Sequence, residues 1–348
     1  MEYRILGRTG VRVSAHCLGA MMFGVWGNTD EEECIRMVHR ALDAGINFVD
    51  TADVYSAGVS EEIVGKALKH KRDDVFLATK VHGEMGSGPN ERGNTRLWIQ
   101  REVEASLKRL KTDHIDLYQI HRPEFDTDIE ETLGAITDLV RQGKVRYLGC
   151  STFPAFHVVE SQWASERRGY ERFVCEQPPY SIFVRSIERE LLPVAQRYGM
   201  GVIVWSPLAG GWLAGRYRRG QAAPEGSRGA RWRGVRPVFE RYDVENPAND
   251  RKLDMVEDLE RIADKAGISL LHMSLAWTLA HPAVTSAIIG PRTPEQLEDI
   301  LAGADVRLDD ATLDAIDEVV PPGSVVAQAD LGWTPPWMEP SARRRSRE

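Results

Sequence analysis

The chain has 348 residues, of which 42% are hydrophobic and 28% charged, as in an ordinary globular protein. Its net charge of −8 comes from interspersed acidic and basic residues, which argues against nucleic acid as a partner. The sequence contains no apolar run of about 18 residues and no apolar leader at its start, so we expect no membrane association and a cytoplasmic location.

Residues 3–14 predict a short β hairpin, because two strand-like runs flank a Gly-Arg-Thr-Gly turn. Beyond it, short apolar runs rich in β-branched residues alternate with segments of helical periodicity. One such helical face carries Ile99, Val103, Leu107 and Leu110. The predicted strands are residues 16–20, 47–50, 75–80, 114–121, 145–151, 172–177, 201–206 and 285–290.

Eight strand–helix units in a chain of this length predict an α/β fold, a single (β/α)₈ TIM barrel over residues 1–322 with the hairpin at its start. Two segments interrupt the alternation. Residues 207–247 form a connection without clear periodicity, and connections of this length are usually functional or mobile. Residues 323–348 form a tail that we expect to be irregular, partly packed over the barrel mouth, and disordered at its end. The arginines of the first segment are Arg216, Arg218, Arg219, Arg228, Arg231, Arg233, Arg236 and Arg241, and those of the tail are Arg343, Arg344 and Arg345.

Three of the predicted strands end in an ionisable residue, namely Asp50, Lys80 and His121. Tyr55 lies five residues past Asp50, in the loop before the next helix. A buried charge needs a partner, and the C-terminal strand ends of a parallel barrel converge on the face that carries active sites. We therefore expect these four side chains to meet in space.

Carbonyl reduction needs a hydride on carbon and a proton on oxygen in one enclosed site, and these four residues can supply and control the proton. A tyrosine can give the proton, and a nearby ammonium helps because it stabilises the phenolate. Lys80 would supply the ammonium, Asp50 would hold Lys80 charged, and His121 would orient the carbonyl oxygen or share in the proton transfer. Taken singly, they could be an ordinary buried salt bridge, a polar histidine and a surface tyrosine.

Over roughly residues 1–320 the sequence resembles the aldo-keto reductases, and it shares their motifs in the same order. The resemblance implies NADPH-dependent reduction of an aldehyde or ketone, with Asp50, Tyr55, Lys80 and His121 as the catalytic tetrad. The matching stretches are 3–10 (YRILGRTG), 45–55 (GINFVDTADVY), 60–68 (SEEIVGKAL), 78–80 (ATK), 115–122 (IDLYQIHR), 143–151 (GKVRYLGCS) and 205–208 (WSPL).

No GxGxxG motif follows the first strand, so we do not expect a Rossmann domain. The resemblance implies instead an extended nicotinamide dinucleotide across the barrel mouth. Ser151 and Gln177 would hold its carboxamide, and Trp205 would stack on its nicotinamide ring. The remaining expected cofactor contacts are Ser206, Leu208 and Gly210 along the pyrophosphate, together with Met21, Gln296 and Asp299.

A loop that begins at Gly290 precedes a helix, and the amides at a helix N-terminus favour phosphate. Arg292 in this loop could take a 2′-phosphate with its guanidinium fork, which favours NADPH over NADH, or it could be a solvated arginine. Two positions depart from the family pattern: Thr152 replaces the usual Asn, and Ile300 follows Asp299 where Glu-Asn is usual. These departures predict weaker cofactor binding and leave the tetrad intact.

For the substrate we expect contacts from Met22, Phe23, Trp26, His82 and Trp333, because an apolar, aromatic mouth suits a small carbonyl compound. Such residues are equally often plain core. The arginine-rich segment 207–247 is either a flap over the pyrophosphate or a solvated excursion. The four cysteines are widely spaced without a CxxC motif, so we expect reduced thiols and no metal site: Cys17, Cys34, Cys150 and Cys175.

Two alternatives stay open at this point. The same fold could work in reverse as a sugar or alcohol dehydrogenase, and relatives in this family include channel-associated subunits that hold NADPH as redox sensors. A Ser or Cys hydrolase is disfavoured, because the sequence has no nucleophile elbow beside a histidine. The sequence indicates neither the individual substrate nor the oligomeric state.

Overall fold

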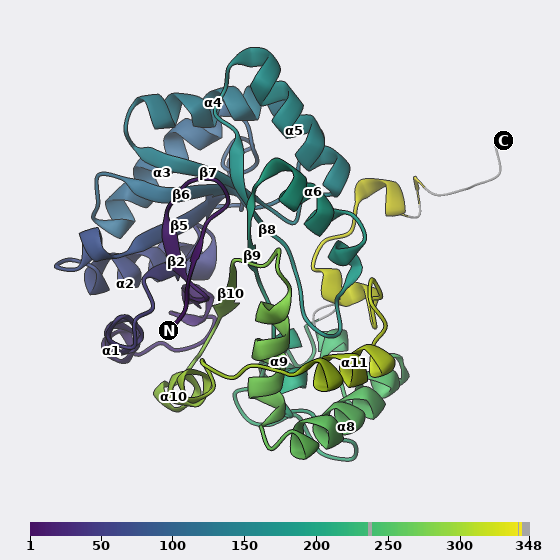
Figure 1. Cartoon of the computed structure of the whole chain (residues 1–348). Coiled ribbons are helices and arrows are strands. Elements are labelled where there is room, and N and C mark those ends of the chain that lie inside the picture. Colours follow the sequence, from purple (N-terminus) through teal and green to yellow (C-terminus); the bar gives the residue numbers. More distant parts are fainter. Residues whose placement is uncertain (236–238, 340, 343–348) are drawn as a thin grey trace.

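Eight parallel strands close into a barrel in the order β10-β3-β4-β5-β6-β7-β8-β9 (Figure 1). The computed structural model describes residues 1–235, 239–339, 341 and 342. Arg236 of the predicted long connection and Arg343, Arg344 and Arg345 of the tail lie outside the described residues. The predicted (β/α)₈ TIM barrel is confirmed, and so is the hairpin before it, formed by β1 (Tyr3–Ile5) and β2 (Arg12–Ser14).

Each predicted strand has a counterpart within one or two residues of its expected ends. The short apolar runs therefore located the barrel correctly, because strands covered on both faces are apolar throughout. The barrel strands are β3 (His16–Gly19), β4 (Phe48–Asp50), β5 (Phe76–Val81), β6 (Ile115–Ile120), β7 (Val145–Ser151), β8 (Phe173–Gln177), β9 (Gly201–Val204) and β10 (Ser286–Ile289).

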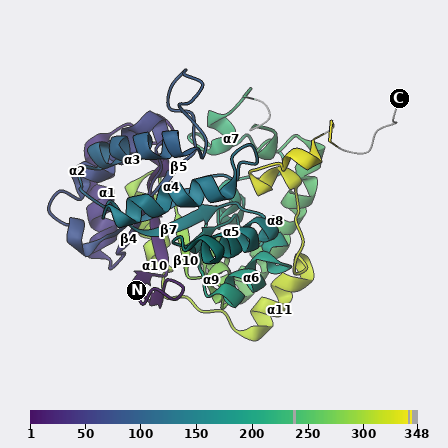
Figure 2. The ribbon, with the colours of Figure 1, turned by 90° about the horizontal axis from the view of Figure 1, so that it is seen from above.

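Helices surround the strands on the outside of the barrel, as the view from above shows (Figure 2). None of the helices in the described part of the chain is long and apolar enough to cross a membrane. The main helices are α1 (Glu31–Asp43), α2 (Val59–Ala67), α3 (Arg96–Leu110), α4 (Ile129–Arg141), α5 (Ala155–Arg168), α6 (Leu191–Tyr198), α8 (Asp250–Lys265), α9 (Leu270–Ala280), α10 (Pro294–Ala302) and α11 (Asp310–Val319).

Side-chain caps fix where several of these helices begin. The side chain of Thr95 accepts a hydrogen bond from the backbone N–H of Trp98 at the start of α3, and Asp128 caps α4 in the same way through Glu130. Such a cap satisfies a backbone N–H that has no partner inside the helix. The apolar face predicted for α3 is buried against the barrel, so the ends of the strands are held between well-anchored helices.

The N-terminal hairpin closes the end of the barrel opposite the strand C-termini. Leu6 and Val13 of the hairpin are fully buried, and they pack with Cys17, Phe48 and Phe76 in a small core cluster inside the barrel. A second, larger cluster fills the space between strands and helices. Because the hairpin covers the N-terminal ends of the strands, the barrel is open at their C-terminal ends, where the functional sites of this architecture lie.

The long connection 207–247 contains only short helical turns among its described residues, the longest being η5 (Ala209–Ala214). The others are α7 (Arg228–Arg231), η6 (Phe239–Arg241) and η7 (Pro247–Asn249), which begins at the last residue of the segment. The tail after α11 forms η8 (Gln328–Leu331) and η9 (Pro336–Met338). Asp330 anchors η8, because it pairs with Lys252 at 2.7 Å and Arg241 at 3.2 Å. Next to it, Gly332 lies against the ring of Trp205.

Candidate active site

The four predicted catalytic residues meet at the open end of the barrel. The Lys80 ammonium nitrogen lies 2.5 Å from Oδ1 of Asp50 and donates a second hydrogen bond to the Thr51 carbonyl at 2.7 Å. The same nitrogen lies 3.2 Å from the hydroxyl oxygen of Tyr55. The ring of Tyr55 is edge-on to that of His121, with 5.7 Å between centroids. Successive strand ends thus bring together residues 71 positions apart in sequence, from Asp50 to His121.

Two glutamines inside the barrel hold the other oxygen of Asp50. Oδ2 accepts hydrogen bonds from the side-chain amides of Gln119 at 3.1 Å and Gln177 at 2.9 Å. Asp50 and Lys80 are both fully enclosed, so each charge depends on this network. Burial acts to lower the pKa of Lys80, but the adjacent Asp50 carboxylate and the Tyr55 hydroxyl outweigh it and raise that pKa above its usual value. Lys80 is therefore an ammonium at neutral pH.

His121 is a neutral imidazole. Burial lowers its pKa well below the usual range, and the nearby charges of Arg122 and Lys80 act in the same direction. Its backbone N–H donates to the Val81 carbonyl at 2.9 Å, which continues the β5–β6 ladder and anchors the backbone that carries the ring. A neutral imidazole in this place can form a hydrogen bond with a ligand but has no extra proton to release.

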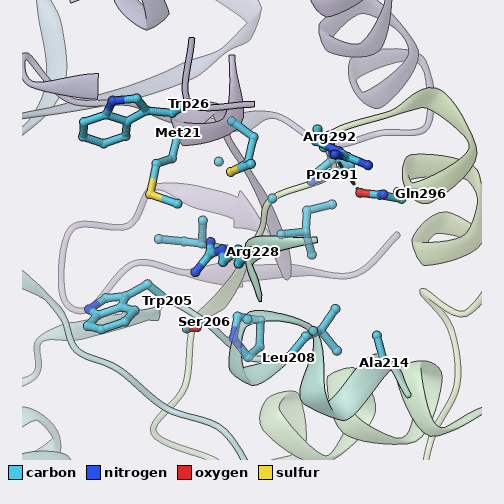
Figure 3. Close-up of a pocket in the computed structure, with 18 of the residues that line it drawn as sticks. Met21, Trp26, Trp205, Ser206, Leu208, Ala214, Arg228, Pro291, Arg292 and Gln296 are labelled. Atoms are coloured by element: carbon cyan, nitrogen blue, oxygen red, sulfur yellow. Dashed lines mark hydrogen bonds between the residues drawn. The ribbon is translucent and has the colours of Figure 1, made fainter. Parts of the chain in front are cut away.

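A cavity of about 490 Å³ opens above these residues. Tyr55, His121, Trp26 and Trp205 border it near the tetrad, and Arg292 and Gln296 border it near the start of α10. Figure 3 shows Arg228 between these two ends, with Trp205 and Met21 to one side and Arg292 to the other. The lining of the cavity thus combines an aromatic, catalytic end with a basic, polar end.

Comparison with known proteins identifies the family. The sequence profile of the aldo/keto reductase family matches residues 16–321 of the chain. The chain belongs to the aldo/keto reductase family. This membership supports an oxidoreductase that acts on carbonyl compounds.

Individual relatives match along almost the entire chain. An uncharacterized oxidoreductase of Bacillus subtilis, YrpG, is 40% identical over 341 residues, which cover 94% of this chain and 99% of that protein. A probable voltage-gated potassium channel subunit beta of Arabidopsis thaliana is 36% identical over 334 residues, which cover 92% of this chain and 97% of that protein. A putative subunit of the same kind from Schizosaccharomyces pombe is 35% identical over 331 residues, covering 92% of this chain and 93% of that protein. The chain is thus similar both to an oxidoreductase and to channel subunits.

Most of the residues predicted to bind the cofactor of this aldo/keto reductase line the cavity. Two hydrogen bonds hold the backbone of Arg292 in place. Its N–H donates to Gln296 Oε1 at 3.0 Å, and its carbonyl accepts from the side-chain amide of Asn28 at 3.1 Å. Its guanidinium donates to the carbonyl of Gly226 in the long connection. The lining members of the predicted set are Met21, Gln177, Trp205, Ser206, Leu208, Gly210, Gly290, Arg292, Gln296 and Asp299.

Ser151 does not line the cavity. It is fully buried, and its hydroxyl donates to the Gln177 carbonyl at 2.8 Å, so it supports the wall rather than forming it. The next residue, Thr152, has a backbone φ of +61°, in the left-handed region that asparagine tolerates better than a β-branched residue. Thr152 therefore adopts this backbone conformation at some cost.

Sequence reasoning missed several residues of the site. Gln119 precedes His121 by two positions, so strand alternation places both on the inner face, and that pattern could have revealed it. Arg122 follows His121 directly and lines the cavity. Arg216, Arg228 and Arg241 appeared earlier only as members of an arginine-rich segment, without assigned roles.

Among the described residues, five arginines and two aspartates line the cavity, and one of those aspartates, Asp50, is neutralised by Lys80.

This excess of positive charge fits a ligand with several phosphates. Burial lowers the pKa of Arg216, and the charges of Arg292 and Arg228 lower it further. Such crowding of like charges is unfavourable unless an anion binds among them. The backbone at Gly290 is open to the cavity, since no atom beyond the two neighbouring residues lies within 4 Å of the place where a Cβ would be. The side chains present therefore fit an extended dinucleotide phosphate.

The predicted substrate residues divide into two groups. Met22 and Trp26 line the cavity, and the centroids of the Trp26 and Tyr55 rings are 5.9 Å apart. Phe23 does not line it, because its side chain is fully buried in the large core cluster. His82 also lies outside the lining, because Nδ1 of its ring is bonded to Asn94 at 2.9 Å. Trp333 instead packs on Phe125 with 6.4 Å between ring centroids, beside the mouth.

Two further observations concern sites elsewhere. The four cysteines are free and buried, at positions Cys17, Cys34, Cys150 and Cys175. In the part of the chain that the structure describes, no three His, Cys, Asp or Glu side chains are grouped so that they could hold a metal ion.

Proposed function

We propose that this chain reduces an aldehyde or ketone to an alcohol with NADPH, and that Tyr55 donates the proton to the carbonyl oxygen. The observation that carries the proposal is the 3.2 Å approach of the Lys80 ammonium to the Tyr55 hydroxyl, with Lys80 itself paired to Asp50. An ammonium at this distance stabilises the phenolate that remains once the proton has left. Tyr55 borders the cavity, so a bound carbonyl can reach its hydroxyl.

The neutral state of His121 favours Tyr55 as the acid. A buried imidazole that stays neutral can orient a carbonyl oxygen through a hydrogen bond, but its remaining N–H is a far weaker acid than an imidazolium. Of the two roles considered for His121, orientation is therefore the one we propose. Trp26 and Met22 would enclose the substrate from the side of the β3 loop and exclude water.

When bound, NADPH would supply a hydride from its nicotinamide ring. Trp205 offers an aromatic face for that ring at the catalytic end of the cavity. Arg216 and Arg228 would bind the pyrophosphate, and Arg292 would bind the 2′-phosphate through its fork, which favours NADPH over NADH. The long connection carries Arg216 and Arg228, which supports the flap interpretation of residues 207–247 over the solvated one. We also propose the cytoplasm as the compartment, because the four cysteines are free and buried.

A second candidate is an NADPH-binding subunit that senses redox state. It is favoured by the similarity to proteins described as probable or putative potassium channel β subunits. Such a subunit would bind NADPH tightly without efficient turnover. Operation in the oxidative direction on a sugar or alcohol would use the same residues, with Tyr55 as the base.

The experiment is to follow NADPH oxidation spectrophotometrically with purified protein and a panel of carbonyl compounds, such as nitrobenzaldehyde, methylglyoxal and phenanthrenequinone, with NADH in parallel. Tyr55→Phe removes the acid and little else, so we expect it to reduce turnover by roughly a hundredfold or more. NADPH binding, measured by quenching of tryptophan fluorescence, should persist in this variant. Undiminished turnover in Tyr55→Phe would refute the assignment of the acid, and tight NADPH binding without any turnover in the wild type would favour the sensor.

A further inference from the structure

Arg122 lies two residues past the end of β6, immediately after His121, and lines the cavity. Its guanidinium makes three hydrogen bonds with described residues, and one nitrogen, Nη1, makes all of them. The acceptors are the His121 carbonyl at 2.6 Å, the Thr152 hydroxyl at 3.3 Å and the Ser151 hydroxyl at 3.5 Å. Nε and Nη2 have no acceptor among the residues that the structure describes. One edge of the guanidinium fork is therefore available to a ligand.

The positive charge of Arg122 also lacks a partner. Within the described residues, no carboxylate lies within ion-pair distance of its guanidinium, whereas Arg241 of the same cavity is paired with Asp330 at 3.2 Å. Glu176 interacts with Arg122 only at longer range, and burial raises the pKa of Glu176 to about 7, so it carries no full charge at neutral pH. A largely enclosed cation bonded only to neutral oxygens is costly, and an anion bound beside it would remove that cost.

The position of Arg122 separates it from the arginines that we assign to the cofactor. Its guanidinium carbon lies 5.9 Å from the centre of the Trp205 ring, and it interacts electrostatically with Tyr55. Arg216 and Arg292 instead lie near one another, where the long connection meets the loop before α10. Arg122 is thus a cation at the catalytic end of the cavity, where the reacting carbonyl would bind.

We propose that Arg122 binds a carboxylate of the substrate, so that the preferred substrates are oxo acids, meaning aldehydes or ketones that carry a carboxylate group. The free edge of one guanidinium matches the two oxygens of a carboxylate. This inference rests on the proposed carbonyl reduction, because it names the substrate class of the same site. Arg122 would act as a specificity residue, while Tyr55 remains the acid.

The test compares matched substrates of nearly the same shape, one with a carboxylate and the other with a neutral amide. We would measure kcat/KM for 4-formylbenzoate against 4-formylbenzamide, and for 4-oxobutanoate against 4-oxobutanamide, in the wild type, Arg122→Lys and Arg122→Leu. Arg101→Leu, an exposed arginine on α3, is the control. We expect the wild type to prefer the carboxylate by roughly tenfold to a hundredfold, as for a hydrogen bond to a charged group. The ratio should fall to near one in Arg122→Leu, fall partly in Arg122→Lys, and stay unchanged in Arg101→Leu.

A wild type without preference for either carboxylate would overturn the proposal, and so would a preference that survives in Arg122→Leu. If Arg122→Leu lowers NADPH affinity and affects charged and neutral substrates equally, Arg122 serves the cofactor and the proposal also fails. If Arg122→Leu does not fold, as judged by thermal unfolding, the conservative Arg122→Lys carries the comparison.

Failure of the proposed reduction itself would be visible separately, as absence of turnover with every carbonyl. In that case we would measure the binding of benzoate and of benzamide to the NADPH-loaded protein by calorimetry, and this comparison tests the anion site on its own. Tighter binding of benzoate that is lost in Arg122→Lys and Arg122→Leu supports an anion site at Arg122. Equal binding of the two compounds, or a preference that the variants retain, overturns it.

Discussion

The ammonium of Lys80 and the carboxylate of Asp50 form an ion pair at 2.5 Å, and both side chains are enclosed within the barrel. Removing one member of such a pair leaves the other charge buried without compensation. We expect Lys80→Met to abolish carbonyl reduction and to lower the free energy of unfolding by about 3–5 kcal/mol. Denaturant-induced unfolding, monitored by tryptophan fluorescence, measures the second effect.

The double variant Asp50→Asn/Lys80→Met separates stability from catalysis. The side-chain carbonyl of the introduced asparagine could still accept a hydrogen bond from Gln119 or Gln177, and no buried charge would remain at this pair. We expect the double variant to recover most of the lost stability and none of the activity. A single Lys80→Met variant as stable as the wild type would contradict the ion-pair argument.

The second prediction concerns the basic end of the cavity. Arg292 has its backbone fixed by Asn28 and Gln296, so truncation of its side chain should leave the loop in place. We expect Arg292→Ala to lower NADPH affinity by roughly tenfold to a hundredfold, because a charge-assisted contact with the 2′-phosphate is lost. NADH affinity should change little, since NADH has no 2′-phosphate.

Fluorescence titration with both cofactors measures this difference. Arg36→Ala, on the exposed side of α1, is the control and should alter neither affinity. Equal losses for NADPH and NADH in Arg292→Ala would remove the 2′-phosphate role and would point to a general effect on the loop before α10.

The third prediction concerns the contact between the tail and the cavity. A Cβ added to Gly332 would overlap the edge of the Trp205 ring, and the φ of Gly332 is +72°. We therefore expect Gly332→Ala to displace Trp205 and to lower kcat/KM by roughly tenfold to a hundredfold, as small misplacements in a site do. Steady-state kinetics with varied NADPH concentration measures the effect.

The control for this substitution is Gly267→Ala, after α8. Gly267 has a similar φ of +69°, but no atom lies within 4 Å of its missing Cβ. Both variants should lose some stability through backbone strain, and only Gly332→Ala should lose activity. A comparable loss of activity in Gly267→Ala would show that strain alone, and not the contact with Trp205, explains the result.

The part of the site that the sequence predicted follows from chain order alone. Asp50, Lys80 and His121 lie within one residue of the ends of successive parallel strands. The parallel strands of a barrel must converge at their C-terminal ends. The apolar character of the strands fixed those ends to within one or two residues. Gln119 was open to the same reasoning, because it shares the inner face with His121.

Residues whose role depends on loop conformation could not be predicted in this way. Phe23 and Trp26 lie three positions apart in one turn, yet only Trp26 borders the cavity, because the turn directs Phe23 into the core. His82 continues the inner face of β5 by position, but its hydrogen bond to Asn94 holds it outside the lining. The contact of Gly332 with Trp205 joins segments far apart in sequence, and no local pattern records it.

The fourth prediction concerns Glu176, a fully buried carboxyl group behind the loop that carries Thr152. Oε1 of Glu176 accepts a hydrogen bond from the backbone N–H of Phe153 at 3.1 Å, and Oε2 has no partner among the described residues. Burial raises the pKa of Glu176 from its usual 4.5 to about 7. The folded protein therefore retains a proton on Glu176 at pH values where the unfolded chain has released it.

The sign of the resulting pH dependence follows from this difference in proton binding. Below about pH 4.5 Glu176 is protonated in both the folded and the unfolded state, so its titration does not change the free energy of unfolding. Between about pH 4.5 and pH 7 the folded state loses stability as the pH rises. Glu176→Gln keeps an acceptor for Phe153 and removes the titration. We expect this variant to be more stable than the wild type by up to about 3 kcal/mol near pH 8, and to differ little near pH 4.5. Thermal and denaturant unfolding at the two pH values, with the exposed Glu62→Gln of α2 as control, measures the difference, and a variant no more stable than the wild type near pH 8 would contradict the raised pKa.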